Sequence, residues 1–288
     1  MINWMLTTLF CSIILFSSCP HLHAEIIETQ NIATVMDHVD ANSIVFFNVT
    51  GTLYKPSTTF ADRQWRDYFS ERVLLIVPEA NNPQNLINRI KNTLVQEIPK
   101  KNVDEFTPIL IANLQQARVP VLGITQKKVS TPYANDFAQI TSNHLVSLGI
   151  YLESTLAYFN IPHMDCDQYS FGHGILFTEK KAAGNAILAI LKNTQHLYSN
   201  VIVVDDSQNF LRIVETTLAE NNIPFVGLRY GRDDARKANF NPILGIIEFI
   251  AFINEGKVMT DEEATDILIT HPEVDYEQLL NELILQLV

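Results

Sequence analysis

The chain has 288 residues, of which 47% are hydrophobic, and its formal net charge is −12. This apolar content is enough for a complete core, and the length suits one large domain or one domain with a smaller insert. The excess of acidic residues argues against a nucleic-acid partner, because binding to a phosphate backbone needs patches of Lys and Arg.

The N-terminal 24 residues contain no Asp, Glu, Lys or Arg, and Met5–Phe16 is an apolar run interrupted only by Thr, Ser and Cys. The segment ends in Leu22-His23-Ala24, a small-residue cleavage site. The pattern predicts a signal peptide over residues 1–24 and an exported protein, either periplasmic or secreted. Two alternatives stay open: a retained N-terminal anchor, and a lipid anchor on Cys19. Later segments are too short or too polar to span a bilayer, so no transmembrane span is expected in the mature chain.

Strands and helices alternate through the middle of the chain. A short helix at 32–39 precedes an apolar strand at 43–47. The later pattern predicts helices at 107–117, 133–148, 181–191 and 209–221, strands at 120–125, 174–178, 201–205 and 223–230, and a strand or hairpin at 150–159. Such alternation is typical of βα units around a parallel sheet. We therefore expect a doubly wound, Rossmann-like α/β core formed by residues 25–54 and 106–240.

Two helical segments are predicted outside this core. Residues 55–105 are too long for a plain connection and are expected to form a small helical cap insert. Trp65, Tyr68 and Phe69 recur there at helical spacing, either lining a pocket or, the interpretation we favour, forming the insert's hydrophobic face. Residues 241–288 are expected to form a C-terminal helical extension, with a capping box at Thr260–Glu263.

Polar residues end three of the predicted strands. Asn48 and Thr50 follow the first strand, Thr125 ends the strand at 120–125, and Asp205 and Asp206 follow the strand at 201–205. Ligands of doubly wound sheets bind at the carboxyl ends of the strands, so these side chains form a candidate site. A simpler alternative for the aspartates is the N-cap of the next helix.

The segment Asn48-Val49-Thr50-Gly51-Thr52-Leu53 resembles the first motif of the haloacid-dehalogenase (HAD) superfamily, an apolar strand followed by Asp-x-Asp-Gly-Thr-Leu. The later order of a strand ending in Thr, a Lys and a strand ending in Asp-Asp is similar to the same superfamily, so the resemblance covers residues 32–230. Within it, the chain looks like a group of exported bacterial proteins of unassigned function. The segments that suggest this group are Gln64-Trp65, Gly174–Thr178, Asp205-Asp206-Ser207 with Asn209, and Phe225–Tyr230.

The resemblance implies roles for these residues. In the superfamily the first Asp of the motif attacks phosphorus and the second acts as acid and base. Thr125 matches the residue that hydrogen-bonds a phosphoryl oxygen. Asp205 and Asp206 match the carboxylates that hold Mg²⁺, and the backbone carbonyl of Thr50 would be a further ligand. Lys181 is the candidate for the superfamily's lysine.

The chain departs from the superfamily where the chemistry is carried out. Asn48 stands at the nucleophile's position, and an uncharged carboxamide is a poor nucleophile. Thr50 replaces the acid/base, and Lys181 lies three residues before Gly184 rather than directly before it. We therefore expect a catalytically impaired phosphatase relative that keeps a weakened Mg²⁺ site and a pocket for a small phosphorylated ligand. The alternatives are an active Mg²⁺-dependent phosphomonoester hydrolase with another nucleophile, and a surface protein that binds an unknown protein partner.

A second group of polar residues lies between the predicted strands. Its members are His163, Asp165, Cys166, Asp167 and His173. These residue types suit a transition metal, but their spacing matches no closed zinc site. We interpret the group as a polar loop.

Overall fold

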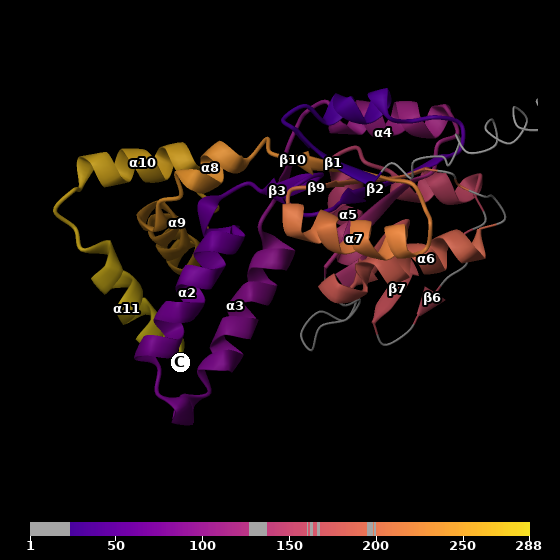
Figure 1. Ribbon diagram of the computed structural model, residues 1–288. Coiled ribbons are helices and arrows are strands. Elements are labelled where there is room, and N and C mark those ends of the chain that lie inside the picture. The colour runs from indigo at the N-terminus through magenta and orange to yellow at the C-terminus, as the bar shows by residue number, and fades with distance from the viewer. Residues whose placement is uncertain are drawn as a thin grey trace, which may run out of the picture.

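The computed structural model describes residues 24–126, 137–159, 161, 164–165, 168–194, 198 and 200–288. Figure 1 shows a lobe built around a β-sheet and a second lobe made of helices. The predicted signal peptide lies outside the described residues, apart from Ala24. Within the described part of the chain, no helix is long and apolar enough to cross a membrane.

The main sheet of the described chain has eight strands in the order β1-β10-β9-β2-β5-β8-β7-β6. Their bounds in that order are Ala24–Thr29, Phe225–Tyr230, Asn200–Asp205, Ser43–Asn48, Val121–Thr125, Ile175–Thr178, Tyr169–Gly172 and Met164–Asp165. The first six strands pair in parallel, and β7 pairs antiparallel with both β8 and β6. The expected α/β class with a mostly parallel sheet is confirmed.

After the edge strand β1, the chain enters the middle of this sheet at β2 and winds outward in both directions. It runs from β2 through β5 to β8 on one side, and then crosses to β9 and β10 on the other. The winding direction therefore reverses between β2 and β9, which are neighbours. Such a switch point is where open α/β sheets bind their ligands. β1 is an edge strand beyond β10 that the sequence analysis did not predict.

Helices cover both faces of the sheet, as the continuous apolar strands require. Val45 and Phe47 of β2 face α4 (Thr107–Gln116) and α5 (Phe137–Ser147), together with η1 (Ile32–Asp37). Ile44 and Phe46 face the other way, toward α6 (Ala183–Asn193) and α7 (Gln208–Glu220). The first turn of the helix predicted at 133–148 lies outside the described residues.

The strand or hairpin expected at 150–159 is wrong, because this segment forms the 3₁₀ helix η4 (Leu152–Ala157). The Thr155 hydroxyl donates a hydrogen bond to the Val121 carbonyl at 2.8 Å, and its oxygen accepts one from the Val121 N–H at 3.3 Å. A side chain of η4 thus satisfies both backbone groups of Val121 at the start of β5.

The helical lobe is built from two segments that lie far apart in the sequence. From the insert come η2 (Thr59–Ala61), α2 (Arg63–Ile76), η3 (Glu79–Asn81) and α3 (Pro83–Glu97), and from the C-terminus come α9 (Pro242–Glu255), α10 (Asp261–Thr270) and α11 (Tyr276–Leu287). The apolar faces of all these elements except η3 form one core. Trp65 stacks on Phe69 at 5.2 Å between ring centroids and lies 5.0 Å from Phe249. Trp65 and Phe69 are thus core residues, as favoured.

Short elements connect the two lobes. The insert leaves and rejoins the α/β lobe through two antiparallel strands, β3 (Tyr54–Pro56) and β4 (Lys100–Asn102). On the other side, α8 (Asp234–Ala238) follows β10 and leads into α9. The capping box predicted at the start of α10 is present, with Thr260 and Glu263 bonded reciprocally.

Candidate active site

Asn48, Thr125 and Asp205 end three adjacent strands, β2, β5 and β9. Asn48 pairs with Ile124, one residue before Thr125, and Phe47 pairs with Val204, one residue before Asp205. The three side-chain positions therefore lie at nearly the same level along the carboxyl edge of the sheet. All three residues are buried.

The loop after β2 folds tightly around Asp206. Gly51 has φ of +93°, and its N–H donates to the Tyr54 carbonyl at 2.8 Å. A Cβ at Gly51 would lie 2.7 Å from Oδ2 of Asp206. The glycine therefore serves both the turn and the close approach of the backbone to this carboxylate.

The side-chain amide of Asn48 is fully engaged as a donor. Its Nδ2 donates to the Thr50 carbonyl at 2.8 Å and to Oδ1 of Asp206 at 3.0 Å. Both partners are acceptors, so the amide orientation is fixed by chemistry. The nucleophile's position thus holds a group that donates both of its N–H bonds to neighbouring protein oxygens.

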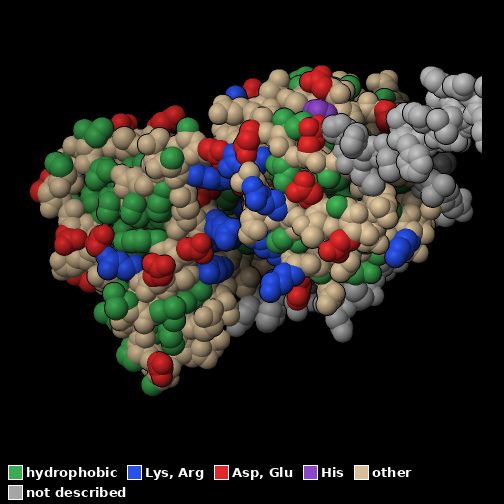
Figure 2. Space-filling view, viewed as in Figure 1, with side chains coloured by type: hydrophobic (Ala, Val, Ile, Leu, Met, Phe, Trp, Pro, Cys, Tyr) green, Lys and Arg blue, Asp and Glu red, His purple; other side chains and the backbone are tan. Residues whose placement is uncertain are grey.

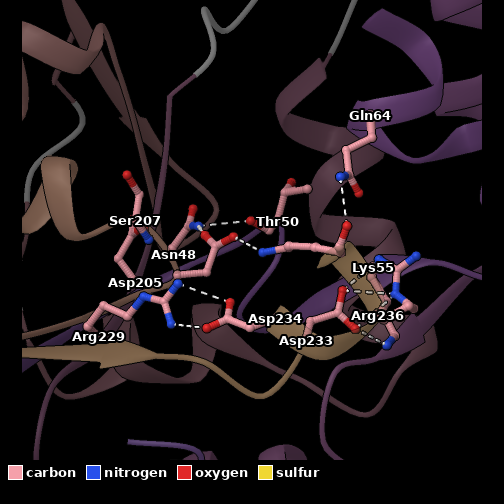
Figure 3. A network of polar contacts seen from close by, with 12 residues as sticks. Asn48, Thr50, Lys55, Gln64, Asp205, Ser207, Arg229, Asp233, Asp234 and Arg236 are labelled. Atoms are coloured by element: carbon pink, nitrogen blue, oxygen red, sulfur yellow. Dashed lines mark hydrogen bonds and ion pairs between the residues drawn. The ribbon is translucent and has the colours of Figure 1, made fainter. Parts of the chain in front are cut away.

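The other oxygen of Asp206 binds a lysine. Nζ of Lys237 lies 2.5 Å from Oδ2 of Asp206, and the two side chains are 33% and 21% exposed. The backbone carbonyl of Lys237 accepts a bond from Nε2 of Gln64 at 2.9 Å. Gln64 lies on α2, so a residue of the insert helps to position a cation at the edge of the sheet (Figure 3).

Asp205 is completely buried at the end of β9. Its Oδ1 accepts the N–H of Ser207 at 2.6 Å, and its Oδ2 has no hydrogen-bond partner among the described residues. Burial, together with the charge of Asp206, raises the pKa of Asp205 well above its usual range. The N-cap of α7 is Ser207, whose hydroxyl accepts the N–H of Phe210, so the N-cap alternative for the two aspartates is wrong.

A second polar cluster lies beside the site, where the lobes meet. Asp233 accepts bonds from Lys55 at 2.5 Å and from Nε of Arg236 at 2.9 Å, and Arg236 also pairs with Asp62 of the insert. Burial raises the pKa of Asp233, but the bonds from Arg236 and Lys55 outweigh it and lower that pKa overall.

Nearby, Arg229 pairs with Asp234. Figure 2 shows Lys and Arg side chains gathered at this boundary between the lobes. Arg229, Lys55, Arg236 and Lys237 each bond an aspartate, so the local charges are balanced.

The other predicted site residues lie elsewhere or in different roles. Lys181 is exposed in η5 (Lys180–Ala182) and has no hydrogen bond or ion pair within the described part of the chain. Gly184 lies where α6 crosses α7, since a Cβ there would be 2.3 Å from Cβ of Thr217. That glycine is explained by helix packing.

The 163–173 group falls mostly outside the described residues. His173 is described and pairs with Glu153. No cluster of three or more His, Cys, Asp or Glu suited to a metal ion occurs among the described residues.

The donor set does not fit the Mg²⁺ that the resemblance implies. Mg²⁺ needs free oxygen lone pairs in near-octahedral geometry. The Thr50 carbonyl and Oδ1 of Asp206 accept from Asn48, and Oδ2 of Asp206 accepts from Lys237. Among the described carboxylate oxygens of Asp205 and Asp206, Oδ2 of Asp205 alone has no partner.

Fold and site define a doubly wound α/β protein with a polar site at the switch point of its sheet. The chain matches the family described as a protein of unknown function, DUF2608, over residues 27–265, and it belongs to that family. It is also similar to an uncharacterized protein of Rickettsia prowazekii (strain Madrid E). The two are 20% identical over 275 residues, which cover 93% of this chain and 98% of that protein. No solved structure matches.

Proposed function

We propose that this protein is a HAD-like relative of phosphatases that binds a small phosphorylated ligand without hydrolysing it. The winding of the sheet supports the relationship, because the matching motif residues Asn48, Thr125 and Asp205 fall on adjacent strands around the switch point. Thr125 offers a hydroxyl at this edge, and the partly exposed ammonium of Lys237 offers N–H donors to a phosphate.

The observation that carries the proposal is the state of Asn48. An attacking group needs an available, preferably charged, lone pair. The carboxamide is neutral, and both of its N–H bonds are directed at the Thr50 carbonyl and Asp206. Thr50, at the acid/base position, has a hydroxyl that does not exchange protons readily near neutral pH. Neither position of the motif therefore supplies the chemistry of phosphoryl transfer.

Hydrolysis of p-nitrophenyl phosphate by the purified protein tests the absence of turnover. We expect no release of nitrophenol above a protein-free control, with Mg²⁺ or with EDTA. The intact mass of the peptide containing Asn48 must show no deamidation, since that reaction would create the missing carboxylate. Mg²⁺-dependent turnover by unmodified protein, lost in Asn48→Ala but kept in the surface variant Lys192→Gln, would show that the proposal is wrong.

Ligand binding is tested separately with inorganic phosphate as the probe. A ligand that binds only the folded state raises Tm as its concentration rises. We expect phosphate to raise the Tm of the wild type and to have little effect on Thr125→Val. An equal response of both proteins would remove the phosphate-binding part of the proposal.

We further propose that the protein is exported and that its signal peptide is removed by cleavage between Ala24 and Glu25. In the structure, β1 begins at Ala24 and its next five residues pair with Val226–Tyr230, so cleavage there leaves the edge strand almost intact. Sequencing the N-terminus of the protein from its native host tests this, and a mature chain that starts at Cys19 would indicate the lipid-anchored alternative.

A further inference from the structure

We propose that Lys237, together with the amide of Asn48, takes the place of a divalent metal ion in this site and excludes it. The candidate site then contains its own fixed cation. This inference concerns the metal alone, and it holds whether or not the site hydrolyses phosphate esters.

The positions of the two nitrogen atoms support the replacement. The oxygen atoms matched to Mg²⁺ ligands include the Thr50 carbonyl and the carboxylate of Asp206. Nδ2 of Asn48 bridges those two groups at 2.8 and 3.0 Å, and Nζ of Lys237 binds the remaining oxygen of Asp206 at 2.5 Å. A metal that bridged the Thr50 carbonyl and Asp206 could take that position only after Nδ2 of Asn48 had moved away. It could replace the ammonium at Oδ2 of Asp206 only after Nζ of Lys237 had moved away.

Lys237 is held in place by the fold. Its backbone carbonyl accepts the bond from Gln64 of α2. Its neighbour Arg236 pairs with Asp233, which is the N-cap of α8, and also with Asp62 in the insert. The short helix α8 is thus tied to both lobes, and the ammonium projects from it to Asp206. A lysine on a surface helix without such contacts would not have its backbone position fixed in this way.

The electrostatics favour the lysine over the metal. The ammonium neutralises the carboxylate of Asp206, so a divalent cation could bind that carboxylate in its place only by displacing a charge-assisted hydrogen bond. The ammonium has three N–H donors. One of them binds Asp206, and the described protein residues accept no bond from the other two. These can contact an oxyanion, as a bridging metal would.

The experiment measures metal binding directly. Mn²⁺, used as a paramagnetic substitute for Mg²⁺, is titrated into wild type, Lys237→Gln and Asn48→Asp/Lys237→Gln and followed by electron paramagnetic resonance, with Mg²⁺ calorimetry in parallel. Wild type is expected to show no saturable site in the millimolar range. The double variant releases the Thr50 carbonyl and both oxygens of Asp206 and adds a carboxylate at position 48. It is expected to gain at least about tenfold in affinity, equivalent to ~1.4 kcal/mol.

Lys192→Gln is the matched control, because it removes one exposed positive charge from the last turn of α6, which contributes no residue to the candidate site. It is expected to behave as wild type. Saturable Mn²⁺ binding by wild type overturns the inference, and this measurement needs no variant. Equal, weak binding by all folded variants overturns it too, since Lys237 would then not be what excludes the metal. Far-UV circular dichroism and urea unfolding establish that each variant is folded.

Discussion

Glu248 on α9 is an acidic residue with a fully buried side chain inside the helical lobe. Its Oε2 accepts the backbone N–H of Phe60 at 2.8 Å, which joins α9 to the insert. Burial is the main cause that raises the pKa of Glu248 to about 9, and the adjacent Asp261 carboxyl is the second. At neutral pH this side chain is therefore a neutral carboxylic acid, which is the form that a low-dielectric interior favours.

This raised pKa predicts how stability changes with pH. The folded state holds a proton that the unfolded state releases above about pH 4.5. The contribution of Glu248 to the free energy of unfolding is therefore complete below that pH and decreases above it. It is lost as the pH rises through about 9. Glu248→Gln removes the titration. From pH 6 to 9.5 its free energy of unfolding should fall less than that of wild type, by on the order of 1 kcal/mol or more.

Urea unfolding at several pH values measures this difference. Glu262→Gln is the matched control, because Glu262 is exposed on the neighbouring helix α10. It should follow the wild-type pH profile. Parallel profiles for wild type and Glu248→Gln would show that Glu248 does not hold the extra proton.

Single residues of the candidate site were predictable where a general rule places them. Asn48, Thr125, Asp205 and Asp206 follow apolar strands, and the carboxyl ends of parallel strands share one edge. Lys237 was not predictable, because it lies in a run of mixed charges at 232–237 that is typical of a solvated surface. Its role depends on the approach of α8 to Asp206, which no local pattern encodes.

At the scale of elements, the sequence predicted the helices but not their partners. The apolar spacing of α2 marks which face is buried, but it does not show that α9, more than 160 positions later, covers it. The fit is specific: a Cβ at Gly245 of α9 would lie 2.1 Å from Cδ1 of Trp65. Complementary shape of this kind selects one helix pairing among several with similar hydrophobicity.

Gly245→Ala tests this helix pairing. The added methyl group cannot fit without displacing the buried indole, so we expect a loss of about 1–3 kcal/mol in the free energy of unfolding. Gly172→Ala is the control, since a Cβ there meets nothing within 4 Å. Urea unfolding followed by tryptophan fluorescence measures both, because the chain has two Trp residues and the one at position 4 lies in the predicted leader. Unchanged stability of Gly245→Ala would mean that α2 and α9 pack less closely.

The whole molecule consists of an α/β lobe, which the insert interrupts after β2, and a helical lobe assembled from two distant segments. The β3–β4 pair closes the insert at its base, where the N–H of Ser57 donates to the Pro99 carbonyl at 2.9 Å. The contacts across the boundary near the candidate site are polar, and they include Gln64 with Lys237 and Asp62 with Arg236. Polar interfaces of this kind suit lobes that can each hold their own core.

Two deletions distinguish the dependence of each lobe on the other. A chain of residues 25–240 keeps the insert but removes α9, α10 and α11, so Trp65, Phe69 and the rest of that apolar face lose their partners. We expect aggregation and a red-shifted tryptophan emission. If residues 57–99 are also replaced by Asn-Gly, the β3–β4 pair becomes a hairpin with a favoured two-residue turn, and the apolar surface is gone. This second chain should be monomeric in size-exclusion chromatography and unfold cooperatively in urea. A soluble single deletion with buried Trp65 would show that the insert does not need α9, α10 and α11 to cover its apolar face. A double deletion that fails to fold would show that the α/β lobe depends on the helical lobe for its stability.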